Sequence, residues 1–252
     1  MQKKIIDVSK WNGNINFAKV KADGVDGVII RAGYGFKTVD PCFYNNITNA
    51  IANGLHIGIY WFGYASTVSQ AQTEAKYLVN LLKDYSGQID LPIYYDWEYD
   101  SYNYVKEHYN IKADKTLISN MTRAFCEVLE NAGYFSGFYA NIDYLTKYYT
   151  DDVKKRFTLW IAQWSSKCTY SGNYAIWQYT DCDKINGISS NVDSSYLYSD
   201  LPNIIKNGGF NGYSKITVDT SKFVYDVNQD GVVDEKDLQA LEDYLRKQGI
   251  ID

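Results

Sequence analysis

The chain has 252 residues, a formal net charge of -5 and no cluster of lysine or arginine, so we expect no nucleic-acid partner. It contains no apolar run of about 18 residues, so a membrane-spanning helix is not expected, and the opening MQKKIID lacks the apolar core of a signal peptide. Twenty-five tyrosines and six tryptophans are unusual, because amphipathic rings suit a wet groove that holds sugars, although most must serve the core or the surface.

Strands and helices are predicted to alternate through the first 140 residues, with glycines after several helices. Residues 67–84 carry small and apolar side chains at helical spacing, and Asp114 is placed to cap a long helix. The predicted strands cover 3–8, 25–32, 56–62, 91–98 and 135–140, and the helices cover 16–23, 41–53, 67–84 and 114–132.

The pattern changes after a brief helical piece at 145–149. Three further strands, 158–164, 174–180 and 191–197, follow with only loops between them. The chain therefore predicts an α/β domain of five βα units followed by three strands. Eight strands are enough to close a barrel, and an open mixed sheet is the alternative.

The stretch YYDWEYD places Asp96 and Glu98 at the end of a buried strand. Residues i and i+2 of a strand share a face, so the two carboxyl groups point the same way at a separation of about 6 to 7 Å. Like charges this close favour retention of one proton, which suits acid–base chemistry. The alternative is a pair of acids in salt bridges or caps.

Two more acids join this pair if the barrel closes. Asp7 ends the first strand, and Asp193 lies near the last strand, which a closed barrel places beside the first. Either could instead be a turn residue. Four acids at one rim nevertheless favour a catalytic pit, and the aromatic candidates for stacking on sugars near strand ends are Tyr34, Tyr60, Trp61, Tyr139 and Trp164, with core packing as their alternative.

Other chemistries lack their residues. The four cysteines show no C-x-x-C spacing and the two histidines are far apart, which argues against a zinc site and a Ser-His-Asp triad. Cys168 and Cys182 flank an expected hairpin and are candidates for a disulfide. No cofactor is expected for catalysis.

The C-terminal part begins with a stretch, 201–222, that has little apolar periodicity and is predicted to be a linker. The segment DVNQDGVVDEKD then shows the spacing of an EF-type calcium loop, with a glycine at position 6. We expect a Ca²⁺ site formed by Asp226, Asn228, Asp230, Val232 (through its carbonyl), Asp234 and Asp237. With the apolar face of the helix that follows, residues 223–252 resemble one dockerin repeat, which implies a cohesin-type scaffold as partner. A dockerin has two repeats, so a lone calcium-clamped helix is the preferred interpretation.

Residues 3 to about 200 resemble the family 25 glycoside hydrolases, the lysozymes that cut bacterial peptidoglycan. The resemblance rests on six ordered blocks: IIDVSKWNGNINFAKVKADGVDGVIIRAGYG, GIYWFGYA, LPIYYDWE, GFYANIDYL, LWIAQW and WQYTDCDKINGISSNVD. It implies a catalytic domain over 1–200 with an irregular (β/α)5(β)3 TIM-like barrel, acting as a monomer on glycan strands outside the cell or at the cell wall.

The resemblance also implies cleavage of the β-1,4 bond between N-acetylmuramic acid and N-acetylglucosamine. Glu98 matches the family's general acid, and Asp96, Asp7 and Asp193 match its other three acids. From the residues alone, a direct nucleophile, an inverting base and assistance by the substrate's acetamido group all stay open, and the resemblance favours the retaining, substrate-assisted route. The competing hypothesis is a peptidoglycan- or chitin-binding module without catalysis.

Overall fold

The computed structural model describes residues 3–215 and 226–247. The chain divides into two compact units, Met1–Lys215 and Ile216–Asp252, and each is described by itself. Within the described ranges, no helix has both the length and the apolar character needed to cross a bilayer.

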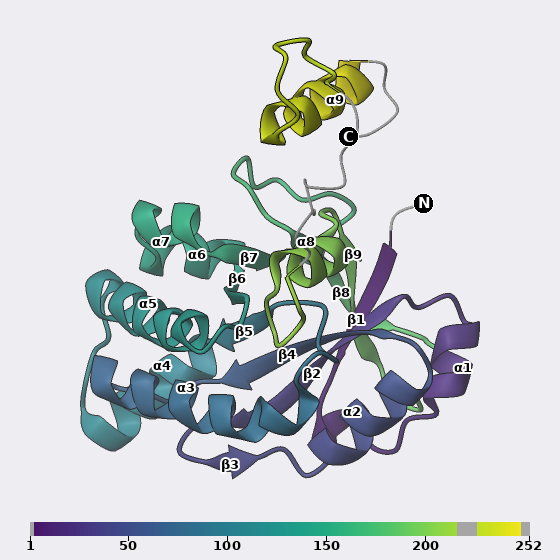
Figure 1. The fold of residues 1–252 in the computed structure, drawn as a ribbon. Helices are drawn as coiled ribbons and strands as arrows, with labels where there is room; N and C mark the ends of the chain where they lie inside the picture. The colour runs from purple at the N-terminus through teal and green to yellow at the C-terminus, as the bar shows by residue number, and fades with distance from the viewer. Residues whose placement is uncertain (1–2, 216–225, 248–252) are drawn as a thin grey trace. The chain divides into compact units, whose positions relative to one another are not determined.

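The first unit is a closed barrel, as the alternating pattern predicts (Figure 1). The strand order is β1-β9-β8-β7-β6-β5-β4-β2-β3, and β1 also pairs with β2, so eight strands close on themselves and the short β3 is added to β2. The strands are β1 (Lys3–Val8), β2 (Gly27–Tyr34), β3 (Thr38–Val39), β4 (His56–Phe62), β5 (Ile93–Asp96), β6 (Ser136–Asn141), β7 (Thr158–Ala162), β8 (Ile176–Asp183) and β9 (Val192–Leu197).

Strand β9 runs against both of its neighbours, whereas the other barrel pairings are parallel. Because β9 is antiparallel, its first residues lie at the edge where β1 ends. The register places Asp193 opposite Asp7. Barrel closure therefore joins two acids that are far apart in the sequence.

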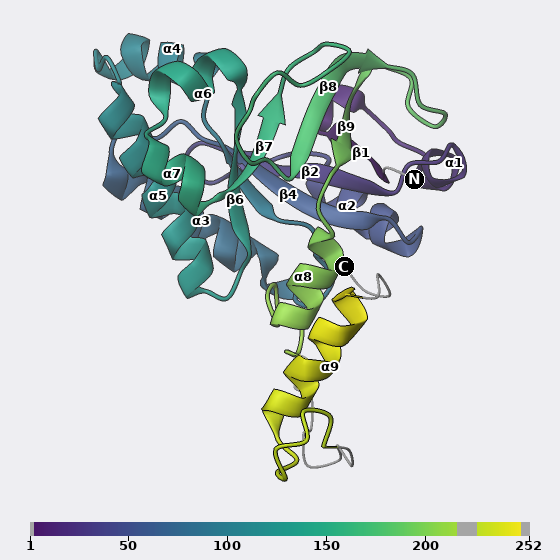
Figure 2. The ribbon, with the colours of Figure 1, turned by 90° about the horizontal axis from the view of Figure 1, so that it is seen from above.

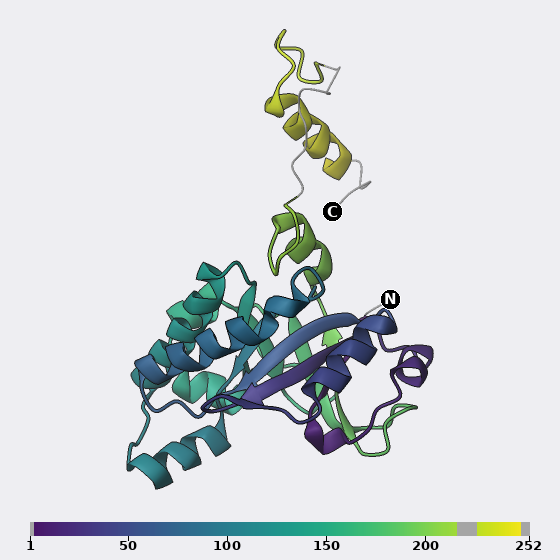
Figure 3. The same cartoon turned by 60° about the horizontal axis from the view of Figure 1, so that its bottom comes forward.

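Helices cover part of the barrel. Helix α2 packs on β2 and β4, and α3 packs against α5 (Figure 3). Viewed from above, α3, α5 and α7 lie on one side of the barrel and β8, β9 and β1 on the other (Figure 2). The helices of this unit are α1 (Phe17–Ala22), α2 (Phe43–Ala52), α3 (Val68–Leu82), α4 (Tyr99–Tyr109), α5 (Lys115–Asn131), α6 (Ile142–Tyr148), α7 (Asp151–Arg156) and α8 (Leu201–Gly208), with short 3-10 turns at Lys10–Asn12 and Lys83–Tyr85.

Two apolar clusters separate the inside of the barrel from its helical layer. The inner cluster contains Ile5, Ile29, Tyr94 and Trp160, and the outer cluster joins alternate strand residues to the helices. This division follows from the two-residue period of strands, whose successive side chains point to opposite faces. The aromatic-rich sequence thus fills both layers.

The prediction of a linker over 201–222 is wrong for residues 201–215. Helix α8 buries Leu201 and Ile205, and the loop after it inserts the side chain of Asn211 beneath the barrel. The Asn211 amide donates to the carbonyl oxygens of Ile89 and Leu91 (3.0 and 3.2 Å) and its Oδ1 accepts from the Phe135 amide (2.7 Å). The prediction overlooked the apolar face that Leu201 and Ile205 give to α8, and in the loop after the helix polar contacts of Asn211 take the place of apolar ones. Residues 216–222 of the predicted linker lie outside the described residues.

The second unit contains a loop from residue 226 and helix α9 (Glu235–Lys247). Asp237 closes the loop on the helix: its carboxylate accepts hydrogen bonds from the amides of Val227 (2.7 Å), Asn228 (3.1 Å) and Asp234 (2.8 Å). Gly231 has φ +87°, a left-handed conformation that favours glycine at the tight turn. The loop therefore has the turn that its spacing predicts.

Candidate active site

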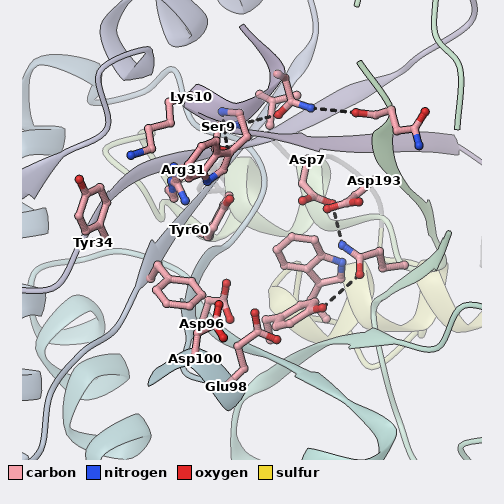
Figure 4. A pocket seen from close by; sticks show the side chains of 18 of the residues that line it. Asp7, Ser9, Lys10, Arg31, Tyr34, Tyr60, Asp96, Glu98, Asp100 and Asp193 are labelled. Atoms are coloured by element: carbon pink, nitrogen blue, oxygen red, sulfur yellow. Dashed lines mark hydrogen bonds between the residues drawn. The ribbon is translucent and has the colours of Figure 1, made fainter. Parts of the chain in front are cut away.

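A pocket of about 500 Å³ opens where the parallel strands end, and all four predicted acids line it (Figure 4). This is the end of a βα barrel at which catalytic side chains gather, because each strand delivers its last residues there. The lining residues are Asp7, Val8, Ser9, Lys10, Trp11, Asn12, Arg31, Tyr34, Tyr60, Phe62, Tyr64, Asp96, Glu98, Asp100, Tyr139, Trp160, Gln178, Asn191 and Asp193.

Asp7 and Asp193 form one side of the acidic group. Gln178, on β8, donates from Nε2 to Asp7 Oδ2 (2.9 Å), and its Oε1 accepts from the hydroxyl of Tyr139 (3.1 Å). Only one oxygen of Asp7 is thereby occupied by Gln178. This network holds Asp7 in a fixed orientation, as expected for a side chain that positions a substrate or another acid.

Asp96 and Glu98 enter the pocket from alternate positions at the end of β5. Asp96 is the last strand residue, and Glu98 precedes α4, with its amide donating to Ser101 Oγ (3.1 Å). The residue between them, Trp97, is fully buried on the other side, where its indole donates to the Ala65 carbonyl (3.0 Å). The buried indole anchors the D-x-E segment so that both acids point inward.

Burial and mutual repulsion keep protons on this cluster. Burial, followed by the nearby charges of Asp193 on Asp7 and of Glu98 on Asp96, raises the pKa of both aspartates well above the usual range. Burial also raises the pKa of Asp193. Burial and then the charge of Asp100 raise the pKa of Glu98 to about 7. Glu98 is only partly exposed, yet it is more open than Asp96, so it can carry its proton to a ligand.

Arg31 supplies the pocket with a counter-charge that the sequence did not single out. Its Nε donates to Oδ2 of the buried Asp40 (2.7 Å), Nη2 lies 2.7 Å from the same oxygen as an ion pair, and its charge opposes the rise in the pKa of Asp96. Asp40 also accepts the amides of Lys10 (3.1 Å) and Cys42 (2.9 Å). One buried carboxylate therefore fixes both the cation and the loop that follows β1.

Three of the five predicted aromatic residues line the pocket: Tyr34, Tyr60 and Tyr139. The prediction for Trp61 is wrong, since its ring is fully buried in the outer cluster against Tyr77. Adjacent residues of a strand face opposite ways, so Tyr60 and Trp61 cannot both face the pocket. Trp164 is outside the lining set, with a ring 59% exposed and an indole that donates to Gln178 Oε1 (3.1 Å).

Several lining residues escaped the sequence analysis, namely Lys10, Trp11, Arg31, Tyr64, Asp100, Trp160 and Gln178. Gln178 lies within the predicted strand 174–180, but the residue pattern there left open which face of the strand its side chain takes. The expected disulfide is also absent: Cys168 and Cys182 are free thiols, as are Cys42 and Cys126. Cys182 instead lies on β8, with its sulfur 3.3 Å from the Thr180 hydroxyl.

The arrangement provides a proton donor beside buried carboxylates in an aromatic pocket. The Oδ1 atom of Asp96 is buried without a hydrogen-bond partner in the described structure, so it is available to a ligand N–H or to a developing positive charge. A protonated carboxyl next to such a group is the requirement for breaking an acetal through an oxocarbenium-like state.

Comparison with known proteins decides the family. The profile of Glycosyl hydrolases family 25 matches residues 6–188. The chain belongs to this family. Of the four predicted acids, Asp7, Asp96 and Glu98 fall inside the matched range, and Asp193 is joined to it by the pairing of β9 with β1.

Similar proteins include a lysozyme, an autolysin and an endolysin. The autolytic lysozyme of Clostridium acetobutylicum is 29% identical over 198 residues, which is 75% of this chain and 54% of the relative. The modular autolysin LytC of Streptococcus pneumoniae, also solved with a synthetic peptidoglycan ligand, superposes with a TM-score of 0.69 at 30% identity, covering 78% of this chain and 47% of that one. The CTP1L endolysin gives a TM-score of 0.69 at 27% identity, covering 81% and 70% of the two chains. This chain spans about half the length of the first two.

Proposed function

We propose that the protein is a lysozyme, an N-acetylmuramidase that hydrolyses the β-1,4 bond between N-acetylmuramic acid and N-acetylglucosamine in peptidoglycan. The observation that carries this proposal is Glu98, whose pKa is raised to about 7 in a pocket that is also lined by four aspartates. Family membership and the named relatives support the same substrate. We place its action outside the cell or at the cell wall, as a monomer.

Glu98 acts as the general acid in this proposal. With a pKa near 7 it is mostly protonated at mildly acidic pH, so it can donate to the glycosidic oxygen as the bond to C1 breaks. The backbone of Glu98 is held in place by the buried Trp97 beside it and by the bond from its amide to Ser101, so the carboxyl is positioned for this transfer. The carboxyl then returns as a base to take a proton from the attacking water.

Asp96 serves the opposite side of the sugar. Its partnerless Oδ1 can accept the N–H of the substrate's 2-acetamido group, which turns the acetamido oxygen toward C1 and stabilises the charge that develops there. The nearby Arg31 favours the ionised form of Asp96. Asp7, held by Gln178 and facing Asp193, keeps Asp96 and the sugar in register. This route retains the configuration at C1.

The test is the release of reducing ends from purified peptidoglycan. Glu98→Gln should lower turnover at least about a hundredfold, because it removes the acid proton and little else. Asp96→Asn should lower it nearly as much, and Glu127→Gln, on the exposed side of α5, is the matched control that should leave it unchanged. Near wild-type rates for Glu98→Gln would refute the assignment. A wild-type protein that binds glycan and releases no reducing ends would instead be a binding module.

We also propose that the loop from Asp226 to Asp237 binds Ca²⁺. Support comes from the EF-type spacing and from the left-handed Gly231 at its turn. Over residues 3–215 and 226–247, no three acidic, histidine or cysteine side chains are gathered closely enough to hold an ion; in this loop, Asp226 and Asp237 accept backbone amides. Ion binding would thus draw the oxygens together.

A titration tests the calcium proposal. Calorimetry on chelator-treated protein should show one Ca²⁺ bound at millimolar concentration or below, and Asp230→Asn with Asp226→Asn should weaken it. The absence of binding at millimolar calcium would refute the site. Chelator should leave hydrolysis almost unchanged, because the catalytic acids belong to the barrel unit. The dockerin-like spacing further suggests a cohesin-type partner, which a binding assay with a cohesin domain would test.

A further inference from the structure

The pocket is acidic on one side and basic on the other (Figure 4). Asp96, Glu98 and Asp100 lie together, and Asp7 and Asp193 lie together. Lys10 and Arg31 are the two basic residues among the residues that line the pocket in the described structure, and both lie with Tyr34 away from Glu98. A ligand in the pocket therefore meets a different charge at each end.

The two basic groups are not equivalent. Arg31 is buried and ion-paired to the buried carboxylate of Asp40; its guanidinium also lies 5.5 Å from the Tyr34 centroid, and its buried Nη2 has no hydrogen-bond partner in the described structure. The Lys10 amine instead lies over aromatic rings, 4.6 Å from the centroid of Trp11 and 5.5 Å from that of Tyr34. Its backbone is fixed by Asp40, which accepts the Lys10 amide at 3.1 Å. Lys10 is thus the basic group presented to a ligand.

The surroundings of Lys10 form a platform for a sugar that carries an anion. Trp11 lines the pocket and is 75% exposed, so the face of its ring is open to a ligand. Sugar faces stack on such rings. A cation held on a partly exposed ring is bound less strongly than in a charge-assisted hydrogen bond, so the amine can exchange the ring for a carboxylate.

The acids decide where an anion can bind. Five carboxyl groups line the pocket around the proposed cleavage point, and those that are ionised repel a carboxylate on the ligand, whereas the Lys10 end attracts it. Peptidoglycan carries such carboxylates, on the lactyl group of muramic acid when it is free and on the stem peptide when it is present. Chitin has the same linkage and acetamido groups and carries no carboxylate.

We propose that Lys10, between Trp11 and Tyr34, binds a carboxylate of the substrate and thereby selects peptidoglycan over chitin. This inference rests on the proposed lysozyme function and adds the specificity-determining residue. The rings of Trp11 and Tyr34 contact a sugar or the start of a stem peptide, and the Lys10 amine pairs with the carboxylate of that sugar or peptide. The contact lies in the ground-state complex, so it acts on binding more than on the bond-breaking step.

Binding to three probes tests the proposal. In the Glu98→Gln background, calorimetry would measure the Kd of a peptidoglycan tetrasaccharide with stem peptides, the same tetrasaccharide after an amidase has removed the stems and freed the lactyl carboxylates, and neutral chitotetraose. Lys10→Met keeps the length and the apolar stem while removing the charge. Lys10→Arg keeps the charge, and Lys21→Gln, on the exposed side of α1, is the matched control.

Lys10→Met should weaken binding of a carboxylate-bearing probe about tenfold and that of chitotetraose less than about twofold. Loss on the stem-bearing probe alone assigns the stem carboxylate, and loss on the stem-free probe assigns the lactyl carboxylate. Lys10→Arg should restore most of the affinity, and the effect should shrink as salt is raised. Equal losses on all three probes, or no loss on any, would overturn the proposal. If the proposal on Lys10 failed but the wild-type protein released reducing ends from peptidoglycan, the proposed lysozyme function would still hold.

Discussion

Asp100→Asn should move the alkaline limb of the pH–rate profile to lower pH. Asp100 is the first charge, after burial, that raises the pKa of Glu98 to about 7 from an ordinary 4.5. A general acid with this pKa is about 99% protonated at pH 5 and about 9% protonated at pH 8, so kcat/KM should fall about tenfold per pH unit above neutrality. Removing the Asp100 charge makes the ionised form of Glu98 less costly and lowers its pKa.

The size of the shift follows from the order of the causes. Burial outweighs the Asp100 charge, so the variant should lose less than half of the rise of about 2.5 pH units, and we expect a shift of about 0.5 to 1 pH unit. The rate at pH 8 should therefore fall about three- to tenfold, with little change at pH 5. Asp100 is exposed, so salt should screen part of this effect.

The assay is the initial rate of reducing-end release from soluble glycan strands between pH 4 and pH 9, at two ionic strengths. Asp84→Asn, an exposed aspartate that does not line the pocket, is the matched control and should leave the limb in place. Because the acids titrate together, the limb reports the cluster, and its response to Asp100 assigns it to Glu98 and Asp96, the two acids whose pKa the Asp100 charge raises. An unmoved limb, or one that moves to higher pH, would refute the reasoning.

Three further predictions concern stability. Asn211→Ala should lower the free energy of unfolding by about 2 to 4 kcal/mol in urea titrations, because three buried backbone groups lose their partner. Glu74 is buried with a pKa raised to about 7 from 4.5, so the stability present below pH 4.5 is lost as the pH rises through 7; Glu74→Gln should equal the wild type at pH 4 and exceed it by up to about 3 kcal/mol at pH 8. Gly137→Ala should cost more than about 2 kcal/mol, because its Cβ would lie 2.3 Å from the Thr158 carbonyl oxygen.

Controls and contrary outcomes are available for each. Asn203→Ala, on the exposed side of α8, should change the unfolding midpoint little. If Asn211→Ala changed the midpoint no more than this control, the buried contacts of Asn211 would be unimportant for stability. A Glu74→Gln protein whose stability follows the wild type at every pH would contradict the raised pKa. Normal stability of Gly137→Ala would mean that β6 and β7 can separate locally.

Local patterns in the sequence determined most of the barrel. The strands at 3–8, 56–62 and 135–140 match β1, β4 and β6 closely, because runs of apolar residues between glycines report burial directly. Helix α4 and helix α8 were missed, since Tyr99–Tyr109 is polar on most sides and α8 is short. Both lie at an end of the barrel, where tertiary contacts replace a broad apolar face.

The acids of the pocket were predictable for a different reason. Asp96 and Glu98 follow a buried strand at a spacing of two, and this local rule brings both to one face whatever the rest of the fold does. The same rule could have removed Trp61, since Tyr60 next to it faces the pocket. The prediction that Asp7 and Asp193 lie together depended on a closed barrel, which the residue pattern favoured but did not prove.

Only the tertiary structure decided the electrostatics. The pairing of Arg31 with Asp40, the bond from Gln178 to Asp7 and the position of Lys10 over Tyr34 join residues through barrel closure and loop packing. Local sequence rules describe which face a side chain takes within its own strand or helix. The pKa values and charges of the pocket depend on distances between different strands and on exclusion of water, and both arise only when β1 and β2 meet and close the sheet.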